Sequence, residues 1–150
     1  MKKLLIGIIA LTALTANASK SYDYTQPIRS INWSDGDSGS ISYYGGHVIQ
    51  FTLADLDAPE TGTVGTAIDS AKCEKERELG FETKELIVNY TRDKEVLITN
   101  HYGQDRYERH LVDLSVDKES LFYIGVHSGA LKLWPHENGK ALGSKPDWCS

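Results

Sequence analysis

The sequence predicts an α+β fold, in which strands pair as hairpins and helices are set aside from them. Two β-prone runs joined by a glycine pair come first, a long charged segment with helical spacing follows, and two more β-prone runs precede a short apolar helical stretch. This order of elements is typical of α+β domains. A small closed barrel is one way to remove the free edges of such a sheet, but periodicity alone does not choose between a barrel and an open sheet.

The first two strands form the best defined local element. The runs "SGSISYY" (38–44) and "HVIQFTLA" (47–54) are rich in β-branched and aromatic residues. Gly45 and Gly46 lie between them, and a glycine pair readily adopts the positive φ angles of a tight turn. We therefore expect a β-hairpin here.

A helix is expected next, over residues 73–93, after a connection rich in glycine and threonine at 61–72. Three apolar positions have helix-compatible spacing: Leu79, Leu86 and Tyr90. Gly80 weakens the middle of this helix, because glycine is a poor helix former. The charged run "CEKEREL" at its start predicts a solvated helix face.

The second half of the chain repeats the pattern of strands followed by a helix. Residues 94–99 and 107–116 are predicted to be strands. The apolar stretch 120–133 is predicted to be a short helix that Gly129 ends. A tail through Pro146 to Cys149 follows.

The first 18 residues have the pattern of a signal peptide. Lys2 and Lys3 precede an apolar run of about a dozen residues, and Ala16-Asn17-Ala18 supplies a small-x-small cleavage site. We therefore expect export to the periplasm or the medium, with residues 19–150 forming the mature chain. A buried amphipathic helix at the N-terminus is the alternative.

The mature chain of about 130 residues is long enough for one domain with a core and too short for two. The full sequence has 16 basic and 21 acidic side chains, so loss of Lys2 and Lys3 leaves a net charge of about −7. This charge disfavours a protein that coats nucleic acid by bulk attraction, and any phosphate contact must be local. No later segment approaches the roughly 18 apolar residues of a membrane span, so we expect no membrane in the mature form.

Cys73 and Cys149 are the two cysteines of the chain. Export would place them in an oxidising compartment, where a lone pair most simply forms a disulfide. Closing a loop of this size stabilises a fold by roughly 4 kcal/mol in the chain-entropy picture, as an upper figure. Two free thiols are the alternative, and no Cys/His cluster has zinc spacing.

Acidic residues gather in three short segments. "LADLDAPE" (53–60) runs an apolar strand into three acids, and such crowding predicts either a cation between the carboxylates or a well hydrated surface. "DGD" (35–37) precedes the hairpin, and "DRYERHL" (105–111) comes later. Taken alone, "DGD" would be a turn, and Asp57 with Glu60 would be a solvated strand end.

Together these segments resemble the staphylococcal nuclease, or thermonuclease, family. Its Asp-Gly-Asp, Asp-x-Pro-Glu and Asp-x-Tyr-x-Arg motifs occur here in the same order, and the resemblance covers roughly residues 31–135. The segments "KCEKERELG" and "PDWC" also resemble exported bacterial members. The resemblance implies an OB-like five-stranded β-barrel with about three helices.

The resemblance also implies a calcium site. Asp37 and Asp57 would supply carboxylates and the Ala58 backbone carbonyl would complete the protein ligands. Calcium is a hard cation that accepts carboxylate, carbonyl and water oxygens in flexible geometry, so this donor set suits it.

The catalytic roles carried over by the resemblance fall on three further residues. Glu60 lies at the position of the candidate general base that deprotonates a water. Arg109 matches the arginine that contacts the scissile phosphate, and Tyr107 matches a tyrosine that touches a nucleotide phosphate. Without this context, Arg109 would be a surface or salt-bridged residue and Tyr107 a packing residue.

Thr52 is the main departure from the family pattern, because the family usually has an arginine there. Losing a charged donor to the developing charge typically costs on the order of a hundredfold in rate. Asp55 adds an acid that would either deepen the charge deficit or serve as a further metal ligand. Three residues are candidates to supply the missing charge: Arg106, His47 and Lys84.

The implied activity is calcium-dependent hydrolysis of phosphodiester bonds in DNA and RNA, by a monomer that leaves 5′-hydroxyl and 3′-phosphate ends. Contacts to the phosphate backbone would give little sequence preference. Two alternatives stay open: a non-catalytic OB-fold module that binds nucleic acid or protein, and an exported protein in which calcium is structural.

Overall fold

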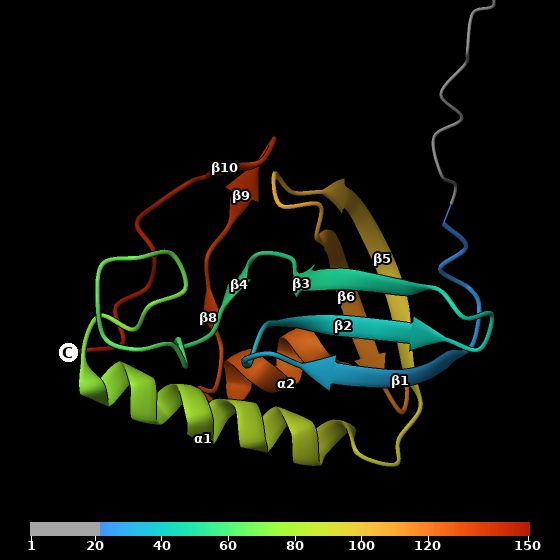
Figure 1. Cartoon of the computed structure of the whole chain (residues 1–150), viewed down its shortest axis with the longest axis horizontal. Helices are drawn as coiled ribbons and strands as arrows, with labels where there is room; N and C mark the ends of the chain where they lie inside the picture. Colours follow the sequence, from blue (N-terminus) through green and yellow to red (C-terminus); the bar gives the residue numbers. More distant parts are fainter. Residues whose placement is uncertain (1–21) are drawn as a thin grey trace, which may run out of the picture.

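The computed structural model describes residues 22–150 and confirms the predicted α+β class (Figure 1). It contains a mixed sheet of six strands and two helices. The expected signal peptide, residues 1–18, lies outside the described residues. In residues 22–150 neither helix is both long and apolar enough to cross a bilayer.

The main sheet has the strand order β1-β2-β3-β6-β5, and β7 pairs with the C-terminal end of β6. Its members are β1 (Ile28–Trp33), β2 (Ser38–Tyr43), β3 (Val48–Leu53), β5 (Val96–Gln104), β6 (His110–Val116) and β7 (Glu119–Ser120). β3 runs parallel to β6, and the other neighbours are antiparallel. Two small ribbons complete the strands: β4 (Leu56–Asp57) with β8 (Lys132–Leu133), and β9 (His136–Glu137) with β10 (Lys140–Ala141).

The expected closed barrel is not confirmed. Within residues 22–150 no strand pairing joins β1 to β5, so the sheet keeps these two edges. A groove of about 570 Å³ lies between them, lined by residues of β1, the C-terminal end of α1 and the start of β5. Two helices are present where about three were expected: α1 (Glu74–Thr91) and α2 (Leu121–His127).

The predicted hairpin is confirmed as β2 and β3. Gly46 has a φ of +88°, so the positive φ falls on a residue that adopts it without strain. β1 was not predicted, because only two of its residues, Ile28 and Ile31, are aliphatic and half of its positions are polar.

The core lies between the sheet and α1, which runs along one side of the strands in Figure 1. Ile41, Phe51 and Ile87 are fully buried there. Trp33 packs edge-on against Phe51, and its Nε1–H donates to the Thr91 hydroxyl at 3.1 Å. This bond fixes the C-terminal end of α1 to β1.

The second helix is shorter than the predicted stretch 120–133. α2 ends at His127, and Gly129 follows with a φ of +76°. Residues 132 and 133 then form β8, which pairs with β4. This pairing brings the C-terminal part of the chain beside the acidic segment that follows β3.

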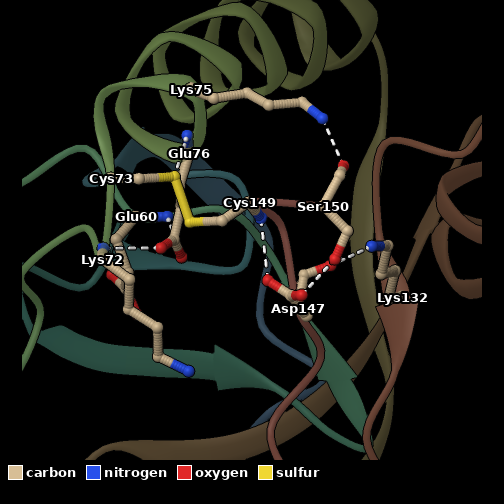
Figure 2. The surroundings of a disulfide bond; sticks show 9 residues. All are labelled: Glu60, Lys72, Cys73, Lys75, Glu76, Lys132, Asp147, Cys149 and Ser150. Carbon is tan, nitrogen blue, oxygen red and sulfur yellow. Dashed lines mark hydrogen bonds between the residues drawn. A yellow bond between two sulfur atoms is a disulfide. The ribbon is translucent and has the colours of Figure 1, made fainter.

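The predicted disulfide between Cys73 and Cys149 is confirmed, with 6.1 Å between the two Cα atoms (Figure 2). Cys73 is the N-cap of α1, so the bond attaches the C-terminal segment to the start of this helix.

Candidate functional site

The Asp-Gly-Asp segment and the segment "DLDAPE" meet in the structure. One oxygen of Asp37, Oδ2, accepts a hydrogen bond from the Ala58 backbone N–H at 2.8 Å. Asp35 shapes the turn, since its Oδ1 accepts from the backbone N–H groups of Asp37 and Ser38. The Asp37 carbonyl in turn accepts from the Leu53 N–H at 2.8 Å. The carboxylate of Asp37 therefore joins the two segments, and a backbone bond holds Asp37 to the end of β3.

Glycines allow α1 to pack against both segments. A Cβ on Gly36 would lie 2.5 Å from Thr83 Cγ2 and 3.0 Å from Ala58 Cβ, both closer than packed atoms approach. Gly80 of α1 similarly faces the backbone carbonyl of Glu60. These close contacts explain why the helix tolerates a glycine in its middle.

Asp57 is buried, with 3% of the residue exposed. Its Oδ2 accepts a hydrogen bond from Trp148 Nε1 at 2.7 Å. Its Oδ1 lies 3.6 Å from the Nζ atom of Lys145. Both partners come from the C-terminal segment, which the sequence placed in no site.

Glu60 lies between α1 and the C-terminal segment, and 13% of its side chain is exposed. Its Oε1 accepts a hydrogen bond from Lys145 Nζ at 2.5 Å. Its backbone N–H donates to Glu76 Oε1 at 3.4 Å, and the buried Glu76 carboxylate also accepts from the Lys72 N–H at 2.7 Å (Figure 2). Glu76 therefore positions the backbone of Glu60, although the sequence placed it on a solvated helix face.

Asp37, Asp57 and Glu60 form the acid cluster of this site, and their burial opposes ionisation. Burial raises the pKa of Asp37 well above its usual value, and the charges of Asp35 and Asp57 raise it further. Burial also raises the pKa of Asp57 and of Glu60, although hydrogen bonds from Trp148 to Asp57 and from Lys145 to both acids oppose this. Burial is therefore the main factor that opposes the charged forms of these three acids.

Lys145 differs from these acids because its charged form is favoured. Burial alone lowers the pKa of its ammonium group, but the hydrogen bond to Glu60 and the charge of Asp57 outweigh burial and raise it. The ammonium group is therefore charged at neutral pH.

Arg109 lies in a turn before β6 rather than in the predicted strand 107–116. Asp105 causes this difference, because its Oδ1 accepts from the N–H groups of Tyr107 and Arg109, each at 2.9 Å, and delays the strand to His110. Asp105 Oδ2 also accepts from Arg109 Nε at 2.8 Å. Burial lowers the pKa of Arg109, but the bond to Asp105 raises it by more, so the guanidinium stays charged.

A cavity of about 370 Å³ brings Glu60 and Arg109 together. Its other lining residues come from β2, β3 and the loops on either side of the cavity: Ser34, Asp35, Ser38, Gly39, Gln50, Phe51, Thr61, Gly62 and Asp69. Asp57 and Lys145 do not line it. Glu60 thus lines the cavity and also forms an ion pair with Lys145, which in turn pairs with Asp57.

Tyr107 and Thr52 both lie outside the lining of this cavity. Tyr107 is exposed, and the guanidinium groups of Arg106 and Arg109 lie 4.8 and 5.3 Å from its ring centre. Thr52 is half-buried on β3 and pairs with Ser38 and Leu111. Neither residue lines the cavity itself.

Asp55 belongs to a turn rather than to the acid cluster. Its φ is +58°, and its Oδ1 accepts from the His136 N–H at 2.8 Å. Its carbonyl accepts from the Trp134 N–H at 2.9 Å. Asp55 therefore attaches the strand end to the C-terminal part of the chain.

The expected ligands are all oxygen donors, which is the chemical kind that a hard cation accepts. Asp37 is a carboxylate whose ionisation burial and two neighbouring acids oppose, and a divalent cation would relieve that charge. Within residues 22–150 no three His, Cys, Asp or Glu side chains are arranged to hold a metal ion, but the expected set has only two carboxylates and a carbonyl. Such a set leaves coordination positions of the ion for water or phosphate oxygens.

Sequence reasoning missed Lys145, Trp148 and Glu76. The one signal for the first two was the disulfide, since a bond from Cys149 to Cys73 places the tail at the start of α1. No signal indicated that Glu76 is buried, because its neighbours in the sequence are charged.

Comparison with known proteins assigns no family to this chain. No protein-family model matches this chain, and no curated protein matches it either. The functional assignment therefore depends on the geometry of the acid cluster and the cavity.

Proposed function

We propose that the protein is an exported, calcium-dependent nuclease that hydrolyses phosphodiester bonds in DNA and RNA and resembles the thermonucleases. The observation that best supports this is the joining of the two acidic segments through Asp37 and Ala58, with Glu60 and Arg109 lining one adjacent cavity. We expect a monomer that acts outside the membrane and leaves 5′-hydroxyl and 3′-phosphate ends.

We also propose that the main sheet is an OB-like barrel. OB-folds are five-stranded and partly open. The order β1-β2-β3-β6-β5 supplies five strands, and the edges of β1 and β5 face a common groove, which supports this arrangement.

Asp37, Asp57 and the Ala58 carbonyl would hold the calcium ion. When bound, the ion would neutralise negative charge on a phosphate oxygen and so favour attack at phosphorus. The ion would also favour the ionised forms of both aspartates, whose burial opposes ionisation.

Glu60 and Arg109 would act on the substrate from the cavity. Glu60 accepts the proton of the attacking water at a carboxylate oxygen, and burial favours this role because it raises the pKa of Glu60 towards neutrality. Arg109 is bonded to Asp105 through Nε, so its terminal amino groups can donate to the phosphate oxygens. Tyr107, exposed beside Arg109, offers a ring and a hydroxyl to the adjacent nucleotide.

A cleavage assay with labelled single-stranded DNA and RNA tests this proposal. The mature protein is incubated with calcium or with chelator, beside Glu60→Gln and Arg109→Ala. We expect cleavage only with calcium and a loss of about a hundredfold or more in each variant. Glu137→Gln, on exposed β9, is the matched control and should retain the activity.

A non-catalytic binding module is the second candidate. Thr52 in place of an arginine favours it, as does the occupation of the Glu60 carboxylate by Lys145. Binding of DNA without cleavage would support the module. Calcium-dependent stabilisation with neither binding nor cleavage would indicate that the ion is structural.

A further inference from the structure

Lys145 places a positive charge inside the acid cluster. Its side chain is 29% exposed, and its Nζ lies 2.5 Å from Glu60 Oε1 and 3.6 Å from Asp57 Oδ1. Within residues 22–150 it is the cation that forms ion pairs with these two acids. One ammonium group therefore bridges an expected metal ligand and the expected general base.

The segment that carries Lys145 is fixed at several points. Cys149 is bonded to Cys73, and Trp148 donates to Asp57. Lys132 Nζ donates to the Asp147 carbonyl at 2.5 Å (Figure 2). Lys145 is thus presented by an anchored segment rather than by a free tail.

We propose that Lys145 is a built-in competitor of the calcium ion at Asp57. This inference depends on the proposed function, because it concerns the same metal site. A calcium ion on Asp57 would lie within a few ångströms of the ammonium group, and two cations at such a distance repel strongly in a partly buried place. Calcium binding therefore requires Lys145 to leave Asp57.

The disulfide sets the strength of this competition. A tethered group acts at a high effective concentration, and this concentration falls when the tether is lengthened. Reduction of Cys73–Cys149 would leave the segment attached by weaker bonds, so Lys145 would compete less well. The site would then bind calcium more tightly in its reduced form.

A role for Lys145 as a phosphate-binding cation beside Arg109 is less well supported. Arg109 and Glu60 line the cavity, and Lys145 does not. Lys145 instead approaches Glu60 together with Asp57, which is the metal side of the cluster.

Calcium titration by calorimetry, without any substrate, tests the competition. Lys145→Met removes the charge and keeps an apolar chain of similar length, and we expect it to bind calcium about tenfold more tightly than the wild type. Lys145→Arg keeps the charge and should resemble the wild type. Lys140→Met, on exposed β10, is the matched control and should also be unchanged.

The wild-type protein treated with a reductant is titrated in the same way. We expect a smaller gain in affinity than in Lys145→Met, because the lysine is still present. If Lys145→Met does not fold, Lys145→Gln removes the charge while keeping a donor for Glu60 and takes its place.

The failures of the two proposals are distinguishable. Equal calcium affinity in the wild type and Lys145→Met would overturn the competition and leave the calcium site standing, and so would weaker binding in the variant. Absence of calcium binding in every variant would overturn the metal site of the proposed function and the competition with it.

Discussion

Gly80 lies directly against the backbone carbonyl of Glu60. A Cβ atom on Gly80 would lie 2.4 Å from this oxygen and 2.9 Å from the carbonyl oxygen of Pro59. Backbone atoms cannot yield as a flexible side chain does, so a larger residue must push α1 and the Glu60 segment apart. A residue that weakens the helix thus sets the position of the candidate base.

Gly80→Ala should therefore destabilise the fold and disturb the site. We expect a loss of roughly 1 to 3 kcal/mol, the usual cost of forcing extra atoms into a packed contact. Urea unfolding measures the loss, and the cleavage assay measures the effect on Glu60. Gly143→Ala is the control, because a Cβ there meets no atom within 4 Å. Equal stability of the two variants would show that the contact is not tight.

Glu76→Ala should leave two backbone N–H groups without their acceptor. Glu76 is buried and receives the N–H groups of Lys72 and Glu60, so we expect a loss of about 1 to 3 kcal/mol. Urea unfolding is the measurement. Glu74→Ala, in the same helical turn but exposed, should lose less than about 1 kcal/mol. A similar loss in both variants would assign the effect to the helix dipole instead.

Thr52→Arg should raise the cleavage rate if the rest of the site is intact. The resemblance to the thermonucleases implies an arginine at this position, and a charged donor to the developing charge is worth up to about a hundredfold. Initial rates on single-stranded DNA measure the gain, with Thr99→Arg on β5 as the control. No gain would mean that another cation already fills the place.

Asp37 should make the calcium-free protein less stable as the pH rises. Burial raises the pKa of Asp37 in the folded chain above its unfolded value, so the folded state holds this proton more tightly. The resulting stabilisation is present at a pH below the ordinary aspartate pKa and is lost as the pH rises through the raised one.

Asp37→Asn should weaken this dependence, since Asp57 and Glu60 with their raised pKa values remain, and should increase the free energy of unfolding at neutral pH in chelator by on the order of 1 kcal/mol. Thermal unfolding at several pH values tests this. A wild type whose stability rises over the same acidic range would contradict it.

The elements that the sequence predicted best are those with local signals. Gly45 and Gly46 between two β-prone runs indicated the β2–β3 hairpin, and helical spacing indicated α1. β1 was missed because residues such as Arg29 and Asn32 interrupt any apolar alternation. Residues 107–109 were read as the start of a strand because the bonds of Asp105 cannot be inferred from composition.

The candidate site was predictable only in part. The motifs indicated Asp37, Asp57 and Glu60. The structure brings the segment of Asp37 into contact with the segment that carries Asp57 and Glu60. Lys145 was not predictable, because it is 85 residues from Glu60 and lies in a segment without regular structure around it. Long-range ion pairs of this kind have no periodicity in the sequence.

The bond from Trp148 to Asp57 joins residues that are 91 positions apart. Contacts of such large sequence separation form late, because the chain must close a long loop before it gains them. During synthesis Asp57 cannot accept this bond until the chain has been made as far as Trp148. We therefore expect the hairpin and α1 to assemble early and the acidic centre to be completed in one of the last steps of folding.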